Sequence, residues 1–149
     1  MPETIIATNR RARHDYTILE SLEAGIELKG TEVKSLRSGR ASLSDSFARF
    51  EGGELFLFNM HVPPYEFGNR FNTEPLRPRK LLLHKREIKR IAQDVATKGV
   101  SLVPLKLYFK DGLVKVELSI AKGKRQYDKR QAIRKRDTDK ELRRALKSR

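Results

Sequence analysis

Apolar residues in the first 121 positions mostly recur at every second residue, the spacing of strands with one buried face. The clearest run is residues 114–120, Val-Lys-Val-Glu-Leu-Ser-Ile. Just upstream, Leu105, Leu107 and Phe109 alternate with Lys106 and Tyr108. Asp111-Gly112 supplies the positive φ angles of a tight type I′ turn. The pattern predicts a hairpin over residues 105–120.

A second hairpin is predicted where residues 46–51 and 54–58, rich in aromatic and branched side chains, flank Gly52-Gly53. Glycine accepts either sign of φ, so this pair suits a tight turn. Two more strands are expected at residues 16–19 and 25–28.

A helical period is confined to two segments of this region. Residues 85–97 carry an apolar stripe, ended by Gly99, that consists of Ile88, Ile91, Ala92 and Val95. In residues 32–38, Val33 and Leu36 are expected to face inward, with Thr31 as the N-cap and Gly39 ending the helix.

About seven short strands with two inserted helices favour a mainly β fold, a closed antiparallel barrel of the oligonucleotide-binding type. Closure removes the strand edges that would otherwise pair with other chains. Four prolines interrupt residues 63–78, so a long mobile loop is expected there.

Charge divides the 149-residue chain into two parts, because residues 1–121 carry a net +5 and residues 122–149 a net +9. The first part is long enough to form one domain with its own core. The second has few apolar residues but good helix formers, so we expect a tail that is disordered when free and helical on a partner. A total of +14 favours a polyanionic partner, nucleic acid before an anionic membrane.

Several classes of function find no support in the sequence. There is no cysteine and the three histidines are far apart, so we expect no metal site. No GxSxG, GxxxxGK or HExxH motif occurs, so we expect that the chain binds no cofactor and is not an enzyme. No apolar run reaches the roughly 20 residues of a membrane span, and no secretory stretch opens the chain, which favours the cytoplasm. Nothing indicates a homo-oligomer, so a monomer is expected.

Each cationic cluster has two interpretations. The segment from Asn9 to His14 suits phosphate and base contacts, or is a solvated charged segment. Lys34 and Arg37 share a helical face that either binds phosphate or is merely solvated. The group of Arg77, Arg79 and Lys80 is expected to expose its charges while its aliphatic stems cover the barrel, and the exposed charges either bind RNA or form plain solvated surface.

Two further positions remain open in the same way. Glu23 is either a turn or salt-bridge residue or an acceptor for base N–H groups. In residues 122–130 a single aromatic, Tyr127, lies among cations, which is typical of a stacking site in an RNA-binding tail or of a solubilising tail.

Five strings of residues resemble the small protein B family in the expected order: residues 9–16 (NRRARHDY), 23–26 (EAGI), 30–37 (GTEVKSLR), 79–84 (RKLLLH) and 123–130 (GKRQYDKR). The resemblance covers essentially the whole chain. It implies an oligonucleotide-binding-type barrel that clasps the tRNA-like part of transfer-messenger RNA (tmRNA) near its elbow, as an adaptor without catalysis.

The resemblance also assigns candidate residues. By matching motif, the family's RNA-facing positions are Asn9, His14, Glu23, Lys34, Arg37, Lys80, Leu83 and Lys124. Their neighbours in the basic clusters, Arg11, Arg13, Lys122 and Arg125, complete the RNA-facing set. The tail that enters the empty messenger channel of a stalled ribosome includes Tyr127, Asp128, Lys129, Arg130, Ile133, Arg134, Arg143 and Leu146. Tyr127 stands where many relatives carry His. The implied partners are tmRNA, the RNA of the ribosome's decoding centre and messenger channel and, indirectly, elongation factor Tu.

Three rival functions follow from composition alone. A ribosome-associated protein that binds ribosomal RNA permanently would show the same basic body. A metal-dependent nuclease on the same barrel would require clustered carboxylates. A binder of anionic membranes would need a denser apolar stripe than the tail offers.

Overall fold

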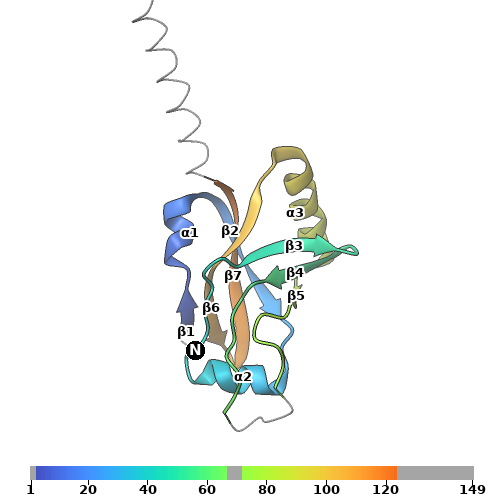
Figure 1. The fold of residues 1–149 in the computed structure, drawn as a ribbon. Helices are drawn as coiled ribbons and strands as arrows, with labels where there is room; N and C mark the ends of the chain where they lie inside the picture. Colours follow the sequence, from blue (N-terminus) through green and yellow to red (C-terminus); the bar gives the residue numbers. More distant parts are fainter. Residues whose placement is uncertain (1–2, 67–71, 124–149) are drawn as a thin grey trace, which may run out of the picture.

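The computed structural model describes residues 3–66 and 72–123, which form one antiparallel β structure with three helices (Figure 1). In chain order the elements are β1 (Thr4–Thr8), α1 (Arg10–Asp15), β2 (Tyr16–Ile26), α2 (Gly30–Arg37), β3 (Phe47–Glu51), β4 (Glu54–Phe58), β5 (Arg79–Leu82), α3 (Lys85–Lys98), β6 (Ser101–Lys110) and β7 (Leu113–Gly123). The predicted mainly β class is confirmed.

The strands pair in the order β1-β6-β3-β4-β5-β2-β7, and β7 pairs again with β6. The path of pairings from β6 through β3, β4, β5, β2 and β7 therefore returns to its starting strand. The β3–β6 pairing in this path consists of a single registered pair, Ala48 with Leu102. β1 adds to β6 outside this path.

Both predicted hairpins are confirmed, and their turns have the backbone geometry that the sequence indicates. Asp111 and Gly112 have φ angles of 52° and 77°, and Gly52 and Gly53 have 58° and 79°. Positive φ at both central residues is the signature of a type I′ turn. The strands of the later hairpin are longer than predicted, beginning at Ser101 and ending at Gly123.

The prediction of two separate strands at 16–19 and 25–28 is wrong, because Tyr16–Ile26 is one continuous strand paired along β7. A bulge between Ile18 and Glu20 changes the face on which alternate residues lie. Ile18 therefore packs with α1, whereas Leu22 packs against the main core. The interrupted alternation concealed the strand's middle.

A similar bulge, between Pro104 and Lys106, divides β6 between two apolar clusters. Leu107 belongs to the main core, whereas Val103 and Leu105 pack under Ala12 of α1. Simple alternation had indicated that Leu105 and Leu107 share one face. The bulge places them on opposite faces. The second cluster fixes α1 on the outside of the sheet.

One of the two predicted helices, α2, differs from prediction at its start. α2 begins at Gly30 with Lys29 as its N-cap residue, so Thr31 lies inside the helix and is not its cap. Glu32 accepts a hydrogen bond of 2.8 Å from the backbone N–H of Lys29. α3 matches its predicted range within one residue, and Gly99 ends it in the left-handed conformation. The short helix α1 was not predicted.

The segment that follows β4 has no regular strand or helix among its described residues, as the prolines indicated. Its two flanks are joined by hydrogen bonds from the Val62 amide to the Pro75 carbonyl and between Tyr65 and the Asn72 amide group. A further bond, from Ser35 Oγ to the Pro63 carbonyl, ties the segment to α2.

Candidate nucleic-acid interface

Asn9 is an 8 % exposed side chain that fixes the first basic cluster on the sheet. Its Oδ1 accepts a hydrogen bond of 3.2 Å from the Ala12 amide, which caps α1, and its Nδ2 donates to the Pro104 carbonyl at 3.0 Å. Both polar atoms therefore have partners within the protein. RNA contact by Asn9 stays a prediction, and its structural contribution is to hold α1.

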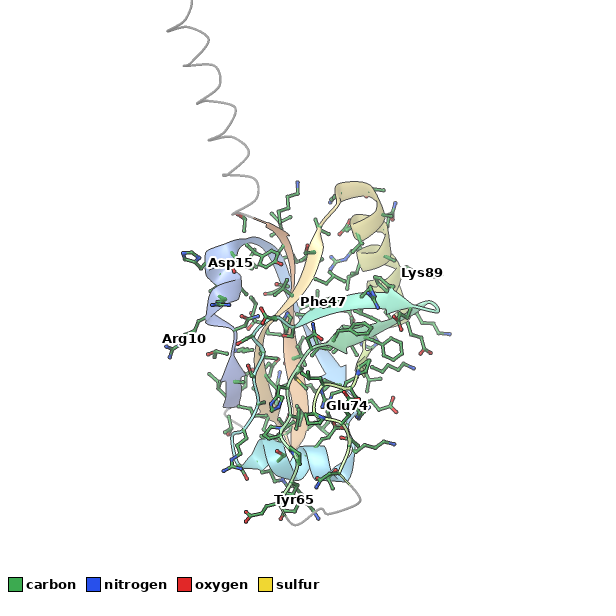
Figure 2. All side chains as sticks on the ribbon, viewed as in Figure 1. Arg10, Asp15, Phe47, Tyr65, Glu74 and Lys89 are labelled. Atoms are coloured by element: carbon green, nitrogen blue, oxygen red, sulfur yellow. The ribbon has the colours of Figure 1, made fainter. Side chains whose placement is uncertain are left out.

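The cations of α1 face solvent, because Ala12 is the helix's buried contact with β6. Arg11, Arg13 and His14 are all exposed (Figure 2 labels the helix at Arg10 and Asp15). Lys122 of β7 is registered opposite Thr17 of β2, beside the end of α1. The structure thus brings the first basic cluster next to the strand end from which the basic tail continues.

A second cationic surface lies on α2. Lys34 and Arg37 are exposed, whereas Ser35 and Leu36 are buried on the opposite side. The Lys34 Nζ lies 5.6 Å from the centroid of the Tyr65 ring, close enough for a cation–π contact. Figure 1 shows that α2 lies at the other end of the molecule from α1 and α3.

The expectation that Arg79 exposes its charge is wrong, because this side chain is 0 % exposed. Arg79 Nε donates to Glu32 Oε2 at 2.6 Å, and its remaining nitrogens donate to the carbonyls of Met60 and Pro75. Arg77 also pairs with Glu32. A buried cation is stable only with such partners, and the decisive one lies 47 residues earlier in the sequence.

Burial by itself would raise the pKa of Glu32. The hydrogen bonds from Arg77, the Lys29 amide and Arg79 outweigh that effect and hold the pKa below its ordinary value. Burial lowers the pKa of Arg79, while the bond to Glu32 and the charge of Glu32 act in the opposite direction. This ion pair anchors α2 to β5, so it supports the surface that carries Lys34 and Arg37.

Glu23 lies on the half of β2 nearer to α2, and its Oε2 accepts hydrogen bonds from the Tyr108 hydroxyl and from Lys110 Nζ. The Tyr108 bond lowers the pKa of Glu23, partial burial opposes this, and Lys110 and Lys115 add to the lowering. Burial and the bond to Glu23 raise the pKa of Tyr108. The carboxylate is thus ionised at neutral pH and held in place while remaining accessible.

Lys80 and Leu83 lie on and just after β5, close to the end of β2. Lys80 Nζ forms an ion pair of 3.2 Å with Glu54, and its side chain is 37 % exposed. Leu83 packs against the main core. Both residues line a hollow of about 500 Å³ between β4, β5 and α3, to which Lys85 and Lys89 also contribute.

The predicted RNA-facing residues fall into two groups. One comprises Asn9, Arg11, Arg13, His14 and Lys122 at the α1 end. The other comprises Glu23 on β2, Lys34 and Arg37 on α2, Lys80 on β5 and Leu83 just after β5. The remaining candidates, Lys124, Arg125 and the tail set from Tyr127 to Leu146, lie outside the described residues.

Sequence reasoning missed a group of outward aromatic rings on β3 and β4. Phe47 and Phe58 stack with centroids 5.5 Å apart, and the Arg49 guanidinium lies 4.5 Å from the Phe58 centroid. The alternation of Phe47, Arg49 and Glu51 was a usable signal, because it places an aromatic ring and a cation on the face opposite Ala48.

Within residues 3–66 and 72–123, no group of three or more His, Cys, Asp or Glu side chains is placed to hold a metal ion. In the same part of the chain, no helix is long and apolar enough to cross a membrane.

Cationic helices mounted on an antiparallel sheet define a class, a small basic β protein with surfaces suited to a polyanion. The SmpB protein family model matches residues 6–148. The "SsrA-binding protein" of Carboxydothermus hydrogenoformans is 63 % identical over 147 residues, which cover 99 % of each chain. That of Enterococcus faecalis is 53 % identical over 144 residues, or 97 % of this chain and 94 % of the relative.

The fold is also similar to a solved structure described as "tmRNA-SmpB: a journey to the center of the bacterial ribosome". That comparison has a TM-score of 0.66 and 59 % identity, and covers 79 % of this chain and 83 % of the other. The chain therefore belongs to the SmpB family.

Proposed function

We propose that this chain binds tmRNA, also called SsrA RNA, and acts as its adaptor in the rescue of stalled ribosomes. The observation that carries the proposal is the 63 % identity, over 99 % of both chains, with a relative named "SsrA-binding protein". The similarity extends over the whole chain and is not limited to one motif. The similar chain described as tmRNA-SmpB supports the ribosome as the second partner.

The body, residues 1–121, acts as a barrel of the oligonucleotide-binding type. The support is the path of strand pairings that returns to β6. Cations on α1 and α2 lie at separate ends of this frame (Figure 1), so they suit phosphates that are far apart on a folded RNA. Recognition of shape rather than sequence is typical of proteins that bind folded RNA.

Three kinds of group make the contact. The cations Arg11, Arg13, Lys34, Arg37 and Lys122, with the tail's Lys124 and Arg125, neutralise phosphates. Glu23, ionised and held by Tyr108, accepts hydrogen bonds from base N–H groups. Leu83, beside Lys80, supplies an apolar contact. Asn9 acts through its cap of α1.

The tail, residues 122–149, reports an empty messenger channel. The body docks near the elbow of the tRNA-like part and replaces the missing codon–anticodon half of a tRNA, while the tail becomes helical in the channel. Peptide transfer belongs to the ribosome and delivery to elongation factor Tu, so the chain itself needs no catalytic group. The site of action is the cytoplasm, and one copy suffices.

Matched substitutions test the interface. Arg37→Ala should weaken tmRNA binding and reduce the dependence of log K on log salt by about one unit, as expected when one phosphate contact is lost. Arg86→Ala removes an exposed arginine from α3, outside the proposed positions, and serves as the control. Equal losses from the two variants would refute the assigned surface.

Truncation tests the division between body and tail. A chain that ends after Arg125 retains the whole of β7 and the proposed phosphate contacts of Lys124 and Arg125, so it should bind tmRNA with an affinity close to that of the full chain. It should fail to rescue stalled ribosomes in a purified translation reaction. A truncated chain that rescues, or one that loses RNA binding altogether, would contradict the division.

A further inference from the structure

The outer face of β3 and β4 carries aromatic rings that the core does not use. Phe47, Phe56 and Phe58 are half-buried, and none of them belongs to either apolar cluster of the body. Their strand neighbours Ala48, Leu55 and Leu57 point the other way, into the main core. Three phenylalanines on one outward face are more than solubility favours, which indicates a binding surface.

Cations lie among these rings. Arg49 is registered opposite Phe56 and places its guanidinium over Phe58 at 4.5 Å. Phe56 is also registered opposite Lys80 on β5. We define the aromatic patch as Phe47, Phe56 and Phe58 with Arg49 and Lys80.

We propose that the aromatic patch binds a single-stranded stretch of the same RNA whose folded part the cationic helices contact. Aromatic rings stack on bases of any sequence, and interleaved cations hold the phosphates between them, which is how single-stranded nucleic acid is bound without sequence preference. The inference rests on the proposed function. It adds a second RNA surface on β3 and β4, apart from α1 and α2.

The patch favours RNA over an apolar protein partner for two reasons. Cations flank its rings, because Arg49 lies over the Phe58 ring and Lys80 is registered opposite Phe56. It is also continuous with the proposed interface through Lys80, which lines the hollow beside Leu83.

Two carboxylates share the face and must be displaced or bypassed. Glu51 pairs with Arg49 at 2.7 Å, and Glu54 pairs with Lys80 at 3.2 Å. These side chains are between 37 % and 58 % exposed, so both are surface ion pairs that contribute little to stability. A phosphate can therefore replace either carboxylate at small cost.

The test uses the absence of tryptophan from the sequence. In the full chain, Phe58→Trp introduces a single tryptophan in the patch, whose emission can be excited apart from that of the tyrosines, and Ile5→Trp introduces one on β1, away from it. A short unstructured oligoribonucleotide should quench the emission at position 58 much more than at position 5. Equal quenching, or none at position 58, would overturn the proposal.

Phe58→Leu supplies the affinity arm, because it removes the ring but retains an apolar side chain. It should weaken binding of full-length tmRNA about tenfold, the effect of losing one stacked base, and leave the isolated tRNA-like part unaffected. Phe58→Tyr, which keeps an aromatic ring, should bind full-length tmRNA as tightly as the unchanged chain. If Phe58→Leu unfolds, Arg49→Gln, an exposed change, repeats the comparison with an expected loss of about threefold.

The two proposals fail in different ways. If both Phe58→Leu and Arg49→Gln bind full-length tmRNA as tightly as the unchanged chain, the aromatic patch is not an RNA surface although the adaptor function stands. If the unchanged chain does not prefer tmRNA to unrelated RNA, the adaptor function fails whatever the patch does. Quenching by ribosomal RNA but not by tmRNA would overturn the choice of occupant.

Discussion

Replacement of Glu32 by Gln should destabilise the body more than any other single loss of charge among the ion pairs described here. Glu32 is 3 % exposed and joins two arginines, one of which, Arg79, is fully buried. The amide fills nearly the same space, so the change isolates the loss of charge. It leaves the Arg79 cation buried without its anion.

The expected cost is about 3–5 kcal/mol, the usual effect of removing one partner of a buried ion pair. Hydrogen bonds from Arg79 to the carbonyls of Met60 and Pro75 remain, which argues for the lower half of that range. Since domains are stable by about 5–15 kcal/mol, the loss is a large part of the total. The melting temperature should fall on the order of 10 °C.

Thermal and urea unfolding followed by far-ultraviolet circular dichroism measure this difference, with Glu51→Gln as the matched control. Glu51 forms an exposed pair with Arg49, so the same substitution there should change stability by less than about 1 kcal/mol. Comparable stability of the two variants would refute the role given to the buried cluster.

The pH dependence gives a second check. Because the folded-state pKa of Glu32 lies below its unfolded value, the ion pair stabilises the fold above the unfolded pKa of about 4.3. That contribution is lost as pH falls through the folded-state pKa. The stability difference between the unchanged chain and Glu32→Gln should therefore shrink in acid. A difference that is constant down to the folded-state pKa would contradict the assignment.

Three further predictions follow from individual contacts. Asn9→Ala removes the cap of α1 and should cost about 1–2 kcal/mol in urea unfolding, with a smaller cost for Asn9→Asp, which keeps the oxygen acceptor but loses the bond to Pro104; equal costs would refute the capping role. Tyr108→Phe removes the main cause of the lowered Glu23 pKa, so a nuclear magnetic resonance titration of that carboxyl should show its pKa rising; no change would contradict the contact. Gly112→Ala forces a side chain into φ +77° and should cost about 1–2 kcal/mol, whereas Gly30→Ala, at an open site with ordinary φ, should be neutral or mildly stabilising in thermal unfolding; similar effects would refute the turn argument.

Features set by neighbouring residues could be predicted from the sequence. The two hairpins depend on turn dipeptides, Asp111-Gly112 and Gly52-Gly53, whose backbone preference is local. α3 has a full apolar stripe and a glycine at its end. In β7, four alternate apolar residues face the main core without interruption. In each case the decisive interactions lie within a few residues.

Features set by distant partners could not be predicted. Arg79 looks like a surface cation until Glu32 is brought to it by the packing of α2 on β5. The bulges at Ile18 and Pro104 change the face of alternate residues, and no local signal marks them. α1 has only six residues, too few for a helical period, and forms because Asn9 and the cluster under Ala12 hold it.

Much the same division applies to the candidate site. The exposed cations of α1 and α2 were found from their spacing and from family strings. The environment of Glu23 depends on Tyr108 and Lys110, 85 and 87 residues away, so its fixed geometry could not be seen in the sequence. The aromatic patch was visible as alternation in β3 and β4, but its rings were taken as ordinary strand residues.

The central claim is that the chain recognises tmRNA rather than RNA in general. Its most direct test is competition binding of the full chain to tmRNA against unrelated structured RNA of equal length, at near-physiological salt where nonspecific phosphate attraction is partly screened. A strong preference for tmRNA is the predicted result. Equal binding of the two RNAs would contradict the claim and leave a generic basic RNA-binding protein.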